Sequence, residues 1–308
     1  MPVNWLADLD QHIHSWGLDA CLCSCGEHET VRRTAEEDED FIEYELALAT
    51  ILGNAYRKKL KEAELLLAQL TDDEETQTED NLITVLNDAN LILSKTYDEA
   101  VEEDVSYELL LAALAGGALV LSGSQRVLTE SNSFDDVVAG IVRSVGYYTN
   151  NHFNTNVIPA IIQTARHAME RQNPMEPFTF TAIREQIETR FKSVPYWRVV
   201  ANAAASRGYH YGLLKAGSLS GYTGYRFKAV LDGKTSSTCR ALNGKTFWLA
   251  DGLQLVERIA LADAKEVKDL APWRTAEQLE GKSADELIQL GAILPPLHGN
   301  CRSTIILV

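Results

Sequence analysis

The apolar residues of the first 215 positions recur at the spacing of amphipathic helices, and this pattern constrains the fold more than any other feature. Leu82, Val85, Leu86 and Ala89 illustrate it, because they share one side of a helix with 3.6 residues per turn. Helices are predicted over about 36–69, 81–99 and 107–121, from Ser133 onwards, and over 160–171, 181–191 and 195–215. We therefore expect a mostly helical body over this part of the chain.

The residue pattern changes after Gly217. Glycines become frequent there, and aromatic and β-branched residues form short runs. Strands are predicted over Tyr225–Leu231, Thr246–Trp248 and Ser303–Val308. Three helices are predicted between the last two strands, over about 252–270, Thr275–Glu280 and Ser283–Leu290, the last two with capping residues Gln278 and Glu286. The expected fold class is α+β: a mostly helical N-terminal body followed by a small C-terminal α+β module with a short sheet.

Charge is divided unevenly along the chain, whose formal net charge is −16. Residues 1–130 hold 8 Lys and Arg against 28 Asp and Glu, whereas residues 131–308 hold 20 against 16. The acidic part would repel a phosphate backbone, and the second part has no basic patch, so we expect that the chain tolerates DNA nearby but makes no strong direct contact with it. The asymmetry is a first sign of two parts with different surroundings. Along the chain we expect a lead arm over 1–30, a helical domain over 31–190 and a C-terminal module over 191–308.

The sequence predicts neither secretion nor contact with a membrane. Residues 1–9 lack the basic start and apolar stretch of a secretory signal. The longest apolar run, Leu109–Leu121, has 13 residues, whereas a bilayer span needs about 20, so we expect a buried helix there. Five cysteines in 308 residues are too few for a disulfide scaffold, which favours synthesis in a reducing cytoplasm.

Two short blocks near the C-terminal end carry the most specific information. The first is Val230–Phe247 (VLDGKTSSTCRALNGKTF), and the second is Leu294–Ile305 (LPPLHGNCRSTI). Together they resemble the paired motif of phage Mu F-like head-morphogenesis proteins. In that family an Asp-x-(Arg/Lys)-Thr block with a Cys and a Gly precedes Pro-Pro-x-His-x-Asn-Cys-Arg. The resemblance covers about residues 190–308, including the helix predicted over Trp197–Lys215, which is similar to the family's Ala- and Arg-containing helix.

The resemblance implies a function in assembly. It predicts a structural minor capsid protein of a tailed phage, with the portal protein and other head proteins as partners. Such a protein resides in the virion, inside the head, with packaged DNA nearby but not strongly bound, and in the host cytoplasm during assembly. It assists head assembly or DNA delivery. The resemblance thus predicts no enzymatic activity. The alternatives are a metal-dependent hydrolase or a toxin-related module, although toxin domains follow this module and the sequence stops at Val308.

Cys239, His298 and Cys301 are the candidate metal ligands of the two blocks. Many relatives have two further cysteines, at positions that are Ser236 and Ser303 here. A structural zinc ion takes four ligands, and three thiolate and imidazole ligands are one short unless Asp232 supplies an oxygen. We therefore predict no cofactor, with the cysteines as small buried packing residues and His298 bonded to a turn. Zinc binding and a Cys239–Cys301 disulfide remain alternatives.

Whichever alternative holds, the two blocks should meet in space and form a structural clasp. Arg302 is placed to pair with Asp232. Pro295 and Pro296 restrain the chain that enters the second block, because proline fixes φ. Gly244 and Gly299 would allow tight turns that bring the blocks together.

A second group of cysteines lies in the lead arm, in the string HIHSWGLDACLCSCGEH. Cys21, Cys23 and Cys25 alternate along the chain, whereas zinc ligands usually have the spacing Cys-x₂₋₄-Cys. With the neighbouring histidines they would bind metal adventitiously, or the segment is a solvated terminal arm. No Gly-x-Ser-x-Gly motif is present, and no cysteine has an identifiable His and Asn partner, so no nucleophile is predicted.

Overall fold

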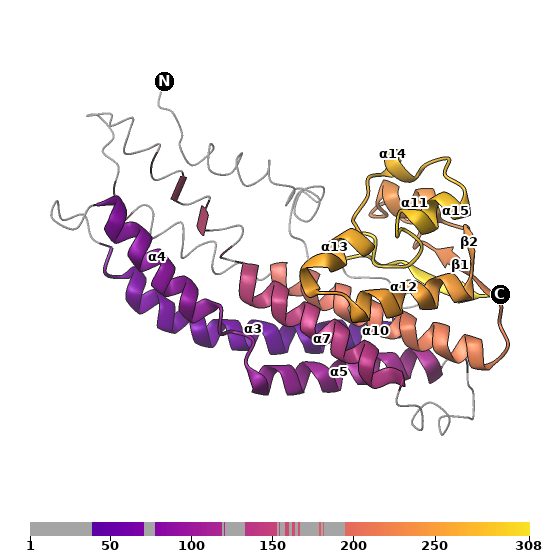
Figure 1. Ribbon diagram of the computed structural model, residues 1–308, viewed down its shortest axis with the longest axis horizontal. Helices are drawn as coiled ribbons and strands as arrows, with labels where there is room; N and C mark the ends of the chain where they lie inside the picture. The colour runs from indigo at the N-terminus through magenta and orange to yellow at the C-terminus, as the bar shows by residue number, and fades with distance from the viewer. Residues whose placement is uncertain are drawn as a thin grey trace. The chain divides into compact units, whose positions relative to one another are not determined.

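The computed structural model describes residues 39–70, 78–118, 120, 133–152 and 195–308, with separate positions at 154, 158, 159, 162, 163, 166, 179 and 181 (Figure 1). The chain forms two compact units. The first holds 52–70, 78–101, 148–152, the separate positions that follow and 195–196. The second holds 39–51, 102–147 and 197–308, apart from the undescribed positions among them. The predicted helices over 160–171 and 181–191 and the lead arm over 1–30 lie outside the continuously described residues.

The first unit is helical. It contains the second half of α3 (Glu39–Leu67), α4 (Glu79–Leu93), the start of α5 (Glu99–Ala118) and the end of α7 (Ser133–His152). The Thr78 hydroxyl accepts a hydrogen bond from the Asn81 amide and caps α4. The Asn150 side chain bonds both the N–H and the C=O of Tyr97, at 2.9 and 3.2 Å, and so satisfies the backbone between α4 and α5. The buried stripe comprises Leu52, Tyr56, Leu60, Ala63, Leu67, Leu82, Val85, Leu86, Ala89 and Leu93.

In the second unit, α10 (Pro195–Leu219) is the central helix. Most of its residues are buried, including the polar Asn202, Ser206 and His210, as expected of a helix in the middle of a core. Glycines let α5 approach it closely: a Cβ on Gly116 would lie 2.0 Å from the Tyr209 carbonyl oxygen, and one on Gly212 would lie 1.8 Å from that of Ala113. The apolar run Leu109–Leu121 therefore starts inside a buried helix.

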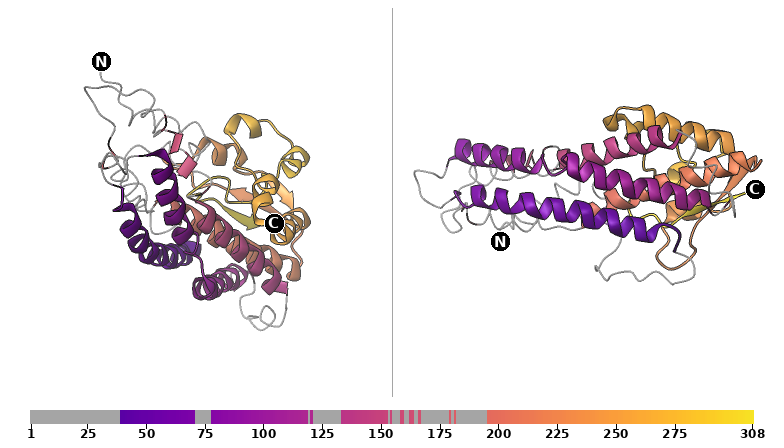
Figure 2. Two further views of the ribbon diagram at one scale, coloured as in Figure 1. Left: turned by 60° about the vertical axis from the view of Figure 1, so that its left-hand side comes forward. Right: turned by 90° about the horizontal axis from the view of Figure 1, so that it is seen from below.

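The sheet has three antiparallel strands in the order β2-β1-β3. The central β1 (Gly224–Lys228) pairs with β2 (Thr246–Trp248) and with β3 (Thr304–Leu307). Tyr225 and Phe227 are on the buried face, against which α12 (Leu249–Leu261) packs, because a Cβ on Gly252 would meet the Tyr225 ring at 2.8 Å. α12 also meets α7 (Figure 2), because a Cβ on Gly140 would lie 2.4 Å from the Ala260 carbonyl oxygen. Arg143 donates to the same carbonyl at 2.6 Å.

Short helices complete the second unit. The 3₁₀ turn η3 (Ala264–Glu266) and α13 (Val267–Leu270) follow α12. α11 (Ser237–Leu242) packs against α14 (Ala276–Leu279), and α15 (Ala284–Gln289) leads to the second block. Thr275 with Gln278 and Ser283 with Glu286 form the two capping boxes that the sequence predicts.

The α+β fold class and the three predicted strands are confirmed. Several details differ. The second helix ends at Leu93 and not near Glu99, and the third begins at Glu99 and not near Tyr107, where the Asp98 carboxylate accepts a hydrogen bond from the Val101 amide. The helix predicted over about 252–270 is divided into α12, η3 and α13. α11 was not predicted, since six residues are too few to show a helical period. Among the described residues, no helix has the length and apolar character that crossing a membrane requires.

Candidate functional site

The first block holds its residues in place through a turn and a short helix. The Asp232 carboxylate accepts hydrogen bonds from the Lys234 amide and the Thr235 hydroxyl, at 2.9 and 3.0 Å. Arg240 closes the turn by donating to the backbone carbonyls of Asp232 and Thr235. The Ser236 hydroxyl then caps α11 by accepting from the Cys239 amide. Cys239 therefore sits in the first turn of α11, 2% exposed.

The second block follows α15 and ends within β3. Leu294 and Leu297 are buried, and the peptide bond between Pro295 and Pro296 is cis. Asn300 has a φ of 55°, so this residue, and not Gly299, takes the left-handed conformation in the turn. Cys301 follows it with no exposed surface, three residues before β3 begins.

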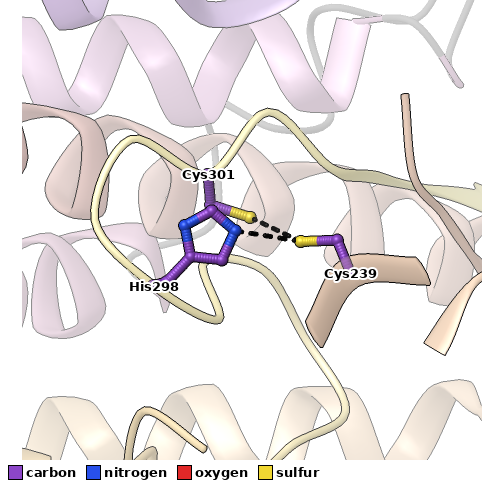
Figure 3. Close-up of side chains that lie close together, drawn as sticks. All are labelled: Cys239, His298 and Cys301. Carbon is purple, nitrogen blue, oxygen red and sulfur yellow. Dashed lines mark hydrogen bonds between the residues drawn. The ribbon is translucent and has the colours of Figure 1, made fainter. Parts of the chain in front are cut away.

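Cys239, His298 and Cys301 come together although they lie in different blocks (Figure 3). The Cys239 sulfur is 3.1 Å from His298 Nε2 and 3.7 Å from the Cys301 sulfur. The three potential ligand atoms all lie within 4.8 Å of one another. On the other side of the imidazole, Nδ1 lies 2.7 Å from the Gly299 carbonyl oxygen. The sequence-predicted metal ligands therefore form one compact group of donors.

Ser236 joins this group, because its hydroxyl lies 2.9 Å from His298 Nε2. The signal for it in the sequence was its place three residues before Cys239, one of two serine positions at which the blocks depart from the motif that they resemble. Ser303, the other such position, is also buried. Asp232, the possible oxygen ligand, does not belong to the group of potential ligands that the structure brings together.

Asp232 instead forms a two-pronged ion pair with Arg302, with N–O distances of 2.7 and 2.6 Å. The Arg302 side chain is 12% exposed and that of Asp232 is 40% exposed. The hydrogen bonds from Arg302, and then those from Lys234 and Thr235, hold the pKa of Asp232 well below its usual range. The ion pair thus joins the two blocks beside the thiol and imidazole group.

The electrostatics of the group favour a negative charge on Cys301. The hydrogen bond between the thiols lowers the pKa of Cys301 well below its usual value, against the effect of burial, and His298 lowers it further. The same hydrogen bond, with burial, raises the pKa of Cys239. Burial lowers the pKa of His298, but its hydrogen bond with Cys301 and the charge there raise it by more. Of the two thiols, Cys301 therefore ionises more readily.

Residues far away in the sequence support the second block. Asn202 on α10 donates to the Cys301 carbonyl at 3.2 Å and to the Glu45 carboxylate at 2.8 Å. Glu45, on α3, is 3% exposed and lies 3.7 Å from the Arg198 guanidinium. His210 bridges Ser206 and Thr304, at 3.2 and 3.3 Å. Sequence reasoning missed these residues, since helical spacing identifies them only as members of a buried face.

The remaining clasp residues lie around this centre. Gly244 has a φ of 83° and donates its amide to the Phe227 carbonyl at 2.8 Å, in the turn between α11 and β2. Pro295 and Pro296 precede the turn that carries His298. Cys21, Cys23 and Cys25 lie outside the described residues.

No protein-family model matches the chain, and neither a curated protein nor a solved structure is significantly similar to it.

Proposed function

We propose that this chain is a minor head protein of a tailed phage, related to the Mu F-like head-morphogenesis proteins, which binds the portal protein inside the head. The observation that carries the proposal is the meeting of the two blocks on which the resemblance rests. Asp232 pairs with Arg302, and Cys239 contacts His298. Two chance matches would have no reason to lie together, whereas the parts of one motif would.

The arrangement also supports an assembly role over hydrolysis. The second candidate function uses Cys239, His298 and Cys301 as a catalytic metal centre, and the convergence of their ligand atoms favours it. Catalysis requires that a substrate reach the metal. The cysteines are 2% and 0% exposed, and the Ser236 hydroxyl lies beside the half-buried imidazole. We therefore place the structural role first.

The exposed face of the sheet is the surface on which we expect the portal protein. Trp248 is 69% exposed, Val308 48% and Ile306 38%. The strand register places them on the same face as Arg226 and Lys228, because paired residues share a face and faces alternate along a strand. An exposed aromatic and aliphatic patch beside two cations suits a partner surface with an apolar centre and acidic groups around it.

Co-expression with the portal protein encoded by the same phage tests the proposal. The untagged chain should co-purify with the tagged portal protein at near-physiological salt. A double variant, Trp248→Ala with Ile306→Ser, should weaken this binding, whereas Leu261→Ser, at a residue 81% exposed on α12, should not. If neither the portal nor another head protein of the phage binds the full chain, the proposed function is wrong.

A further inference from the structure

The separation of the two thiols matches that of a chelating pair. With zinc–sulfur bonds of about 2.3 Å, tetrahedral coordination separates two thiolate sulfurs by about 3.8 Å. The sulfurs of Cys239 and Cys301 lie 3.7 Å apart. A disulfide would bring them to about 2.05 Å. Both side chains are buried, so the two sulfur ligands of a bound ion would lie away from bulk water.

His298 presents the correct nitrogen to the sulfurs. Its Nδ1 lies 2.7 Å from the Gly299 carbonyl oxygen, to which it donates a hydrogen bond when protonated. Nε2 then carries the lone pair, and it is this atom that faces the Cys239 sulfur, as Figure 3 shows. A backbone carbonyl behind a histidine is a usual partner of a metal-ligating imidazole, because it fixes the tautomer and the ring orientation.

The fourth corner of a tetrahedron would lie on the side of Ser236. Its hydroxyl is 2.9 Å from His298 Nε2, and its position is fixed because it caps α11. A neutral hydroxyl is a weaker ligand than a thiolate. The fourth coordination position would therefore be filled either by the serine oxygen or by a water molecule. Two thiolates and one imidazole select a soft or borderline ion such as zinc over magnesium or calcium.

We propose that Cys239, His298 and Cys301 bind one zinc ion, with the Ser236 hydroxyl beside the fourth coordination position. The ion takes the place of the protons that the two thiols and the imidazole otherwise share. It links α11 in the first block to the chain that enters β3 from the second block. Its role is structural, and it does not depend on the proposed function in the phage head.

Elemental analysis of the full-length, untagged chain, purified under reducing conditions, tests this site. The background is a Cys21→Ser, Cys23→Ser, Cys25→Ser variant, which removes the other cysteines. That protein should contain one zinc per chain, and adding Cys301→Ser should abolish the stoichiometric zinc. Zinc content that is unchanged by Cys301→Ser would overturn the proposal, as would a Cys239–Cys301 disulfide in the purified protein.

Two further measurements keep the test valid if Cys301→Ser fails to fold. Cobalt added to the metal-free background protein should give the intense visible bands of a tetrahedral ion and a thiolate charge-transfer band in the near ultraviolet. Ser236→Cys should complete a four-ligand set and raise zinc affinity by on the order of tenfold or more. Failure of the reduced, folded background protein to bind cobalt or zinc would refute the site, whatever the outcome of the portal experiment.

Discussion

The contact between α5 and α10 and the clasp between the two blocks hold the second unit together in different ways. The two helices pack closely because Gly116 and Gly212 have no side chain, so that the backbone of one helix contacts the backbone of the other. The clasp joins its segments through polar and sulfur atoms, with Asp232 bonded to Arg302 and Cys239 next to His298. The first kind of contact tolerates no added volume, whereas the second depends on the charge state and identity of single groups. Mutations should therefore separate the two kinds.

The largest effect is expected at the helix contact. In Gly212→Leu, the new Cβ would overlap the Ala113 carbonyl, 1.8 Å away, so that the helices must separate and their shared core must open. We expect a loss of at least about 3 kcal/mol in the free energy of unfolding, at the upper end of overpacking effects. Denaturant unfolding measures it. Gly233→Ala, where the added Cβ would have nothing within 4 Å, is the control and should change stability little. Equal effects of the two variants would refute the close helix contact.

A smaller, pH-dependent effect is expected at His210, where α10 meets β3. Burial lowers the pKa of His210 to about 4, although the charge of Cys301 and the Ser206 backbone oppose the shift. The ordinary histidine pKa is about 6.5, so the unfolded chain takes up a proton first as the pH falls. The contribution of the neutral His210 to the free energy of unfolding is thus fully present above about pH 6.5. It declines towards pH 4, and the loss at pH 5 is about 2 kcal/mol.

His210→Gln should flatten this decline, because the variant cannot be protonated. Denaturant unfolding of both proteins at pH 8 and at pH 5 gives the comparison. The wild-type chain should lose more stability between these values than the variant does. An equal loss in both would mean that His210 is not held neutral between Ser206 and Thr304.

Removal of the ion pair of the clasp should lower the free energy of unfolding by about 1–2 kcal/mol in each single variant, Asp232→Ala and Arg302→Ala. Asp232 is 40% exposed, and solvent therefore weakens the interaction. The loss in the double variant should be smaller than the sum of the two single losses by about 1 kcal/mol, because the side chains contact each other directly. Since the pKa of Asp232 is lowered, this contribution is present above about pH 4 and is lost in more acidic solution. Strict additivity at pH 7 would show that the pair does not form.

The smallest effect on stability is expected on the exposed face of the sheet. Trp248→Ala should change the free energy of unfolding by less than about 0.5 kcal/mol, because the side chain is 69% exposed. Phe247→Ala, on the buried face of the same strand, should cost about 3–5 kcal/mol and serves as the contrast. Thermal unfolding of both variants checks this. A large loss in Trp248→Ala would mean that the exposed face serves the fold and not a partner.

The sequence by itself determined the elements whose signals are local. The helical spacing, the short runs of the three strands and the two capping boxes all depend on residues a few positions apart, and the structure contains those that fall on its continuously described residues. The two blocks also identified Cys239, His298, Cys301, Asp232 and Arg302, because their residue types are those of ion pairs and metal ligands.

Only the tertiary structure decided which distant residues meet. Asn202 bonds Glu45, 157 positions away, and the carbonyl of Cys301, 99 positions away. Both side chains look like ordinary members of helices in the sequence, and nothing local shows that they are buried together. Hydrogen bonds within a helix or turn are set by neighbouring residues, whereas a contact between distant segments depends on the path of the whole chain. The same reason explains why two cysteines and a histidine that lie apart in the sequence become one candidate zinc site only in the folded protein.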